Sequence, residues 1–234
     1  MRFAVFGATG STGRQFVAQA VARGHDVTAL SRSPDPIGEQ ARVDLVRGNV
    51  LDPEAVEETV TGADGVLCLL GKTANNPEDV VSRGTETICT AMELTDVDRL
   101  VVLTSMGLGS SLSTLPWYIR LANATVLHDL MADKARQEEI VMGSPLEWTI
   151  VRPGGLTDGP LTKNYVHGTD ETLPARPIPR ADVAHFILTV LETGSYRRET
   201  PSVTTDSAVT FRFLYDQFVG VARRTVLSQS PENR

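Results

Sequence analysis

The sequence has only two cysteines among its 234 residues and carries no excess of positive charge. Cys68 and Cys89 lie in apolar or helical runs without metal-site spacing, so we expect two buried thiols rather than a disulfide or zinc ligands. The net charge of −7 argues against binding to a phosphate backbone, because that function needs a basic face. We therefore expect no nucleic-acid partner and no metal.

Long hydrophobic runs are also missing. The apolar run that begins at Phe3 ends at Gly7, which is too short for a secretory signal or a membrane span. We expect a cytoplasmic protein with no membrane partner. Composition and length are those of an ordinary globular chain. The sequence predicts one domain over residues 1–227, followed by a flexible tail at 228–234.

Short, solidly apolar segments alternate with stretches of helical spacing. The segments predicted as strands are 3–6, 27–30, 43–46, 66–70, 100–103 and 148–151. Strands of this kind, separated by helices, are typical of a parallel sheet that helices cover on both faces. We therefore predict a doubly wound α/β fold of the Rossmann type.

Helix boundaries and the C-terminal third can also be predicted. Asp52-Pro53-Glu54 and Asn76-Pro77-Glu78 each predict a helix start, and Gly24 predicts the end of the first helix. Residues 153–179 are rich in proline and glycine, which predicts a small substrate-side lobe with one strand near Tyr165-Val166. A helix over 181–191, a strand near Val203 and a terminal helix over 211–221 follow.

A glycine loop joins the first predicted strand to the first helix. Its sequence is Gly7-Ala8-Thr9-Gly10-Ser11-Thr12-Gly13. Gly7 permits the tight turn, Gly10 lets backbone N–H groups approach a diphosphate, and Gly13 permits close packing of helix on strand. In this position the pattern predicts a dinucleotide site over Gly7, Thr9, Gly10, Ser11, Thr12 and Gly13, rather than an empty turn.

The residues after the second strand bear on the choice of cofactor. NAD-binding proteins usually place an acidic residue there to accept from the ribose 2′-hydroxyl. This chain has Ser31-Arg32-Ser33, and a guanidinium would pair with the 2′-phosphate of NADP(H). Arg14 is a second candidate for the same phosphate. The alternative is that both arginines are solvated surface residues.

With these motifs, the chain resembles the NmrA-like group of the atypical short-chain dehydrogenases, most closely the flavin reductase/biliverdin-IXβ reductase type. The further motifs that carry the resemblance are Gly48-Asn49-Val50, Leu69-Leu70-Gly71, Ser82-Arg83-Gly84, Thr104-Ser105, Arg152-Pro153, Asp158-Gly159-Pro160-Leu161-Thr162 and Arg180-Ala181-Asp182-Val183-Ala184. The resemblance implies that Asn49 and Val50 line the adenine pocket. It places Leu70, Gly71 and Lys72 along the ribose and diphosphate, and it places Thr104, Ser105 and Pro153 around the nicotinamide.

The chain departs from its relatives at two catalytic positions. The Tyr-x-x-x-Lys pair is missing, because Leu130 stands four residues before Lys134. Gly154-Gly155 stands where the flavin-reductase type commonly has a histidine. Ser105 is the remaining catalytic candidate; its hydroxyl would orient the nicotinamide or the acceptor.

Some aromatic and basic residues are candidates for the acceptor side. Trp117 and Tyr118, next to Arg120, could cover a planar acceptor, although a packed helix start is an equally good reading. Among the histidines, His167 is the candidate that could reach the acceptor.

These features favour a monomeric or homodimeric reductase that passes hydride from NADPH to a flavin, quinone or bilin-like acceptor. Such acceptors take their protons from water, so the site needs no strong acid. One alternative is a non-catalytic NADP(H)-binding redox sensor. A second is an enzyme of the nucleotide-sugar epimerase or dehydratase kind, against which the missing tyrosine counts.

Overall fold

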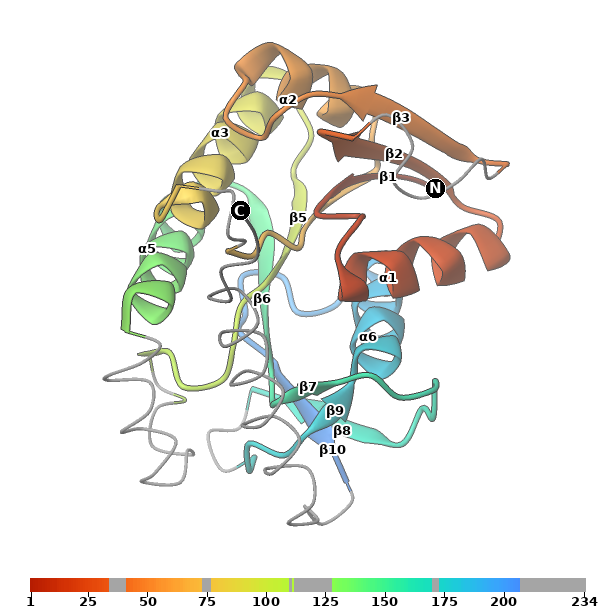
Figure 1. The fold of residues 1–234 in the computed structure, drawn as a ribbon, viewed down its shortest axis with the longest axis vertical. Helices are drawn as coiled ribbons and strands as arrows, with labels where there is room; N and C mark the ends of the chain where they lie inside the picture. The colour runs from red at the N-terminus through yellow and green to blue at the C-terminus, as the bar shows by residue number, and fades with distance from the viewer. Residues whose placement is uncertain (34–40, 73–76, 110, 112–127, 170–172, 207–234) are drawn as a thin grey trace, which may run out of the picture.

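The structure is a computed structural model that describes residues 1–33, 41–72, 77–109, 111, 128–169 and 173–206. Within these residues an eight-stranded sheet runs through the molecule in the order β3-β2-β1-β4-β5-β6-β10-β8 (Figure 1). The strands are β1 (Arg2–Phe6), β2 (Asp26–Ser31), β3 (Val43–Arg47), β4 (Gly65–Cys68), β5 (Arg99–Leu103), β6 (Glu147–Pro153), β8 (Tyr165–Gly168) and β10 (Ser202–Thr205). The first six strands are parallel in the order of a Rossmann sheet, which confirms the predicted fold class.

Helices cover both faces of the sheet. On one face α1 (Ser11–Ala22) packs beside α6 (Arg180–Thr193), and on the other lie α2 (Pro53–Val60), α3 (Val80–Leu94) and α5 (His128–Gly143) (Figure 1). Each face buries its own apolar cluster. A doubly covered sheet needs apolar side chains on both sides of its strands, which explains the unbroken apolar runs of the sequence.

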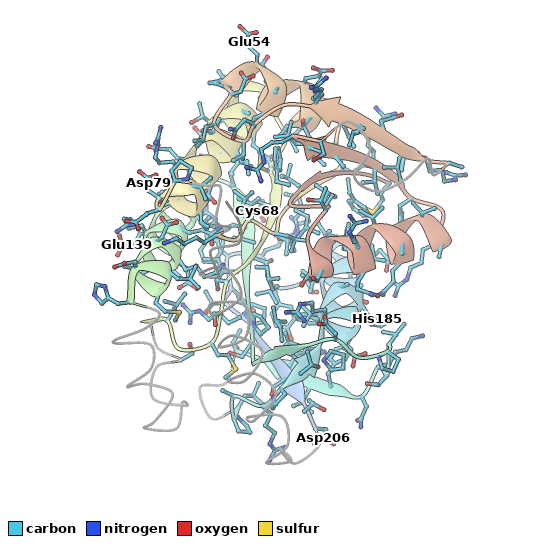
Figure 2. All side chains as sticks on the ribbon, in the orientation of Figure 1. Glu54, Cys68, Asp79, Glu139, His185 and Asp206 are labelled. Carbon is cyan, nitrogen blue, oxygen red and sulfur yellow. The ribbon has the colours of Figure 1, made fainter. Side chains whose placement is uncertain are left out.

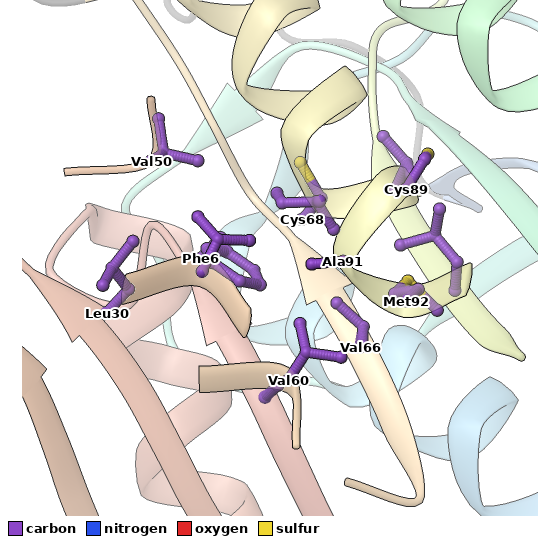
Figure 3. Close-up of a cluster of buried hydrophobic side chains, with 14 of the residues drawn as sticks. Phe6, Leu30, Val50, Val60, Val66, Cys68, Cys89, Ala91 and Met92 are labelled. Atoms are coloured by element: carbon purple, nitrogen blue, oxygen red, sulfur yellow. The ribbon is translucent and has the colours of Figure 1, made fainter. Parts of the chain in front are cut away.

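The core on the α2/α3 side includes Phe6, Val66, Cys68 and Met92, all fully buried (Figure 3). Burial of a large apolar side chain contributes roughly 1.5–3 kcal/mol. Both cysteines are free and buried, as predicted. Burial raises the pKa of Cys89 to about 12, so this thiol stays protonated at neutral pH.

Two of the three helix boundaries are confirmed. Asp52 accepts from the backbone N–H of Glu54 at 3.2 Å and caps α2. Gly24 has a φ of 82° and donates to the Val21 carbonyl at 2.9 Å, and the neighbouring His25 N–H reaches Ala20. This is the Schellman arrangement that ends a helix at glycine.

The predicted helix start at Asn76-Pro77-Glu78 is wrong, because α3 begins at Val80. Its local cap residue, Asp79, makes no side-chain capping bond. The buried carboxylate of Asp133, on α5, instead accepts from the N–H groups of Val81 and Ser82. Capping from a distant helix satisfies the same orphan donors as a local cap, and the local sequence does not reveal it.

The segment over 153–179, predicted as a substrate-side lobe, contains short strands that belong to two sheets. β7 (Leu156–Thr157) pairs with β9 (Ile178–Pro179) in a small parallel sheet. β8, predicted near Tyr165-Val166, extends the main sheet by pairing antiparallel with β10. The terminal helix predicted over 211–221 and the tail at 228–234 lie outside the described residues. Among the helices that the structure describes, none has the length and apolar character to cross a membrane.

Candidate cofactor-binding and active site

A cleft of about 260 Å³ lies at the carboxyl ends of β1, β2 and β4. Ligands of open α/β sheets bind at this edge. The lining residues are Phe6, Gly7, Thr9, Gly10, Leu30, Ser31, Arg32, Ser33, Gly48, Asn49, Val50, Leu69, Leu70, Gly71, Lys72 and Val80. The structure thus brings together most of the residues that the sequence predicts for the cofactor.

The three glycines of the loop differ in what they do. Gly7 has a φ of 87°, and a Cβ there would lie 2.6 Å from the Leu69 carbonyl oxygen. A Cβ on Gly13 would overlap the carbonyl oxygen of Gly7. These two glycines are therefore required by the fold itself. Gly10 has an ordinary φ of −69°, and a Cβ there would meet only the Gly7 carbonyl, at 3.3 Å. Since Gly10 lines the cleft, its missing side chain leaves room there.

The first turn of α1 offers its N–H groups without a protein anion. Gly10 is the N-cap and provides no side-chain bond, and the first turn contains no acidic residue. By contrast, α2 has both a capping Asp52 and an acidic Glu54 in its first turn. An uncapped helix start behind a glycine loop suits a bound diphosphate. Ser11, Thr12 and Gly13 form this turn, just beyond the cleft lining.

The end of β2 brings a cation to the cleft. Arg32 is exposed and lines the cleft, and the buried Ser31 hydroxyl accepts from the Ser33 N–H at 3.2 Å. The described lining contains no carboxylate that would repel a 2′-phosphate. The second arginine weighed for this phosphate lies elsewhere: Arg14 lines a different hollow, between α1 and α6.

Asn49 and Val50, predicted to line the adenine pocket, also line the cleft. The Asn49 side-chain oxygen accepts from Leu51 N–H at 3.1 Å, which fixes the turn after β3. Val50 is held close to α3, because a Cβ on Gly84 would lie 2.8 Å from the Val50 Cγ1 atom. Lys72 is also in the lining, and its ammonium nitrogen lies 3.6 Å from the Glu78 carboxylate.

The predicted nicotinamide residues lie at the ends of β5 and β6, outside the lining of the cleft. The Thr104 N–H, just after β5, donates to the Val151 carbonyl of β6 at 2.9 Å and so joins the ends of these two strands. The Thr104 hydroxyl donates to the buried Glu138 carboxylate at 2.7 Å. The Ser105 hydroxyl is half-buried and donates to the Met106 carbonyl at 3.0 Å. Pro153 is buried, and its carbonyl accepts from the Met106 N–H.

A buried polar network behind these residues was not predicted. Arg152 forms two hydrogen bonds to Glu138, at 3.0 and 2.7 Å, with both side chains at most 6% exposed. Lys134 donates to the Leu103 carbonyl at 3.2 Å, and burial lowers the pKa of its ammonium group. The network therefore ties α5 to the ends of both strands. The sequence pattern that could have indicated this network is the row of polar residues on the buried face of α5, at Asp133, Gln137 and Glu138.

The histidine expected to reach an acceptor is engaged in an aromatic cluster. His167 Nδ1 lies 2.7 Å from the Tyr196 hydroxyl, and its ring packs at a tilt against Phe186 with the ring centroids 4.7 Å apart. On α6, the Nδ1 atom of His185, a residue labelled in Figure 2, lies 2.7 Å from the Tyr165 hydroxyl. Burial lowers the pKa of both histidines. No three metal-binding side chains gather anywhere among the described residues.

The acceptor-side candidates Trp117, Tyr118 and Arg120 lie outside the described residues.

A family model described as NAD(P)H-binding matches residues 7–194. The chain belongs to this NAD(P)H-binding family. Its relatives include an uncharacterised chloroplast protein of Arabidopsis thaliana, 28% identical over 202 residues that cover 80% of this chain and 70% of the relative. Photosystem II assembly factor Ycf39 of Synechocystis is 26% identical over 210 residues, covering 86% of this chain and 61% of the relative.

Solved structures share the fold of this NAD(P)H-binding chain. The anaerobilin reductase ChuY of Escherichia coli O157:H7 superposes with a TM-score of 0.76 at 23% identity, covering 90% of this chain and all of its own. At this identity the likeness establishes the fold, and function has to be argued from the site. The comparisons thus establish an NAD(P)H-binding family and a shared Rossmann-type fold.

Proposed function

We propose that the protein is a reductase that takes hydride from NADPH and delivers it to a flavin, quinone or similar conjugated acceptor. The observation that carries the proposal is the cleft itself. Gly10, whose backbone conformation does not itself require glycine, and Arg32 at the end of β2 line this cleft, and the uncapped first turn of α1 directly follows Gly10. The residues present therefore fit NADP(H).

The cofactor supplies the hydride, so the chain has to bind, orient and exclude water. In our proposal the N–H groups of the first turn of α1 hold the diphosphate. Arg32 pairs with the 2′-phosphate, and Asn49 and Val50 enclose the adenine.

At the other end of the cofactor, Ser105 orients the nicotinamide or the acceptor through its hydroxyl. The buried Glu138–Arg152 pair fixes the two strand ends that carry this serine and Pro153. Protons come from water, because a flavin or quinone needs no protein acid. The half-buried Ser105, hydrogen-bonded to a neighbouring carbonyl rather than to a base, suits this orienting role.

A second candidate function is that of an NADP(H)-binding protein without turnover. Leu130 replaces the usual tyrosine acid, and the Thr104 hydroxyl is engaged by Glu138. A relative named as an assembly factor also favours this candidate.

NADPH oxidation against a panel of flavins, quinones and bilins decides between the two candidates. The reductase reading expects turnover with at least one of these acceptors and faster oxidation of NADPH than of NADH. Tight NADPH binding without oxidation by any acceptor would favour the non-catalytic protein.

A further inference from the structure

A second hollow lies between the beginnings of α1 and α6. It has a volume of about 420 Å³ and shares no lining residue with the cofactor cleft. Its walls come from the first turns of α1 and α6 and from the loop after β7. The lining residues are Ser11, Arg14, Gln15, Asp158, Gly159, Pro160 and Arg180.

Two guanidinium groups face this hollow against a single carboxylate. Arg180 pairs with Asp158 at 2.6 Å, but the Asp158 side chain is 82% exposed. An ion pair so open to water holds its arginine weakly, and a ligand anion can compete for it. Arg14 uses its Nε to donate to the Thr9 carbonyl at 3.0 Å, its one side-chain bond within the described residues. The terminal amino groups of Arg14 therefore remain for a ligand.

The wall formed by the loop after β7 is fixed in advance. Asp182 of α6 is fully buried and accepts three hydrogen bonds, from the Thr162 N–H and hydroxyl and from the Lys163 N–H. Lys163 takes a φ of 57°, a conformation that these bonds hold in place. Because the loop is tied to α6 next to Arg180, an anion that binds here meets a preformed site.

The hollow also lies where an extended acceptor can reach it. Ser11 of the hollow directly follows Gly10 of the cofactor cleft. The loop with Asp158 follows β7, which begins three residues after Pro153 at the expected nicotinamide end. An acceptor stacked at that end can therefore extend a side arm toward both arginines.

We propose that this hollow is an anion subsite that binds a phosphate or carboxylate on the side arm of the acceptor through Arg14 and Arg180. The inference rests on the proposed reductase function and narrows its substrate class to anionic conjugated acceptors. Guanidinium groups suit this task, because their planar N–H pairs match the oxygens of phosphate and carboxylate.

Matched acceptor pairs test the subsite. FMN and riboflavin share one ring system and differ in a phosphate; biliverdin and its dimethyl ester differ in two carboxylates. We expect kcat/KM to favour the charged member of at least one pair by roughly tenfold or more, the usual size of a charge-assisted contact.

Arg14→Gln and Arg180→Gln should each remove most of that preference and leave the uncharged member unaffected. Arg42→Gln is the control and should keep the preference, because this exposed arginine bonds to Asp26 and to the Gly24 carbonyl beyond the C-terminal end of α1.

A binding measurement separates failure of the subsite from failure of the proposed function. Flavin and bilin affinities for the NADP⁺-loaded protein can be measured even when no acceptor turns over. Tighter binding of a charged acceptor that Arg180→Gln weakens about tenfold supports the subsite in either case. Equal affinities within both pairs, or equal losses for charged and uncharged members in the variants, would overturn it and leave the reductase proposal standing wherever turnover occurs.

Discussion

Replacing Glu138 by leucine should destabilise the protein strongly, because this carboxylate satisfies buried donors on two strands. It accepts from the Thr104 hydroxyl and from two nitrogens of Arg152, and the Arg152 side chain is only 4% exposed. The variant removes the carboxylate that pairs with this buried guanidinium charge. Breaking one side of such a pair costs about 3–5 kcal/mol, out of a total stability of roughly 5–15 kcal/mol. For a chain of this size that corresponds to a fall in Tm of about 6–20 °C.

Urea unfolding followed by circular dichroism measures this loss, with two variants for comparison. Glu139→Leu changes the neighbouring exposed residue of α5 and should stay within about 0.5 kcal/mol of the natural protein. The double variant Glu138→Leu/Arg152→Met removes both charges and should recover most of the loss. A Glu138→Leu protein as stable as the Glu139→Leu control, or a double variant no more stable than the single one, would refute the reasoning.

Three further predictions concern the site and its surroundings. Arg32→Ala should weaken NADPH binding by about 10- to 100-fold, the value of a charge-assisted contact, and NADH binding much less; fluorescence titration with equal losses for both cofactors would refute the 2′-phosphate assignment. Ser105→Ala should lower kcat by about tenfold or less with NADPH affinity unchanged, whereas a loss beyond roughly 1000-fold would reveal a proton relay. Burial, and then the charges of Arg23 and Lys163, lower the pKa of His185 below its usual 6.5, so the unfolded chain binds protons first as the pH falls. Stability should therefore decline with falling pH below about 6.5, and His185→Gln should show a shallower decline in urea unfolding; identical slopes would contradict this.

The sequence predicts the features that depend on neighbouring residues. The parallel sheet with helices on both faces follows from apolar runs alternating with helices, and the glycine loop at the first strand marks the cofactor cleft. Gly24 and Asp52 determine helix ends through contacts within a few residues. In each case the chemistry that fixes the structure lies in the same short segment, so its pattern is visible in the sequence.

The features that the sequence analysis missed depend on residues far apart in the chain. Asp133 caps α3 from a position 52 residues beyond Val81. Glu138 engages Thr104 from α5, 34 residues away, so the serine and proline at the strand ends depend on a helix that local patterns do not link to them. Arg14 faces α6 rather than Arg32, because the packing of α1 against α6 decides which hollow it lines. Long-range pairing of this kind leaves only weak signals, such as polar residues on a buried helix face.

The affinity of Gly10→Val for NADPH tests the central claim most directly, because it separates a binding role of the loop from a folding role. The backbone at Gly10 has a φ of −69° and a ψ of 164°, which valine adopts, and its Cβ would meet one protein atom, at 3.3 Å. Gly143→Val, at the open end of α5, is the matched control. Thermal unfolding should show Gly10→Val folded, with a Tm within about 2–4 °C of the natural protein. Titration calorimetry should detect no NADPH binding to this variant, while the control binds normally. A folded Gly10→Val protein that binds NADPH as tightly as the natural chain would contradict the account.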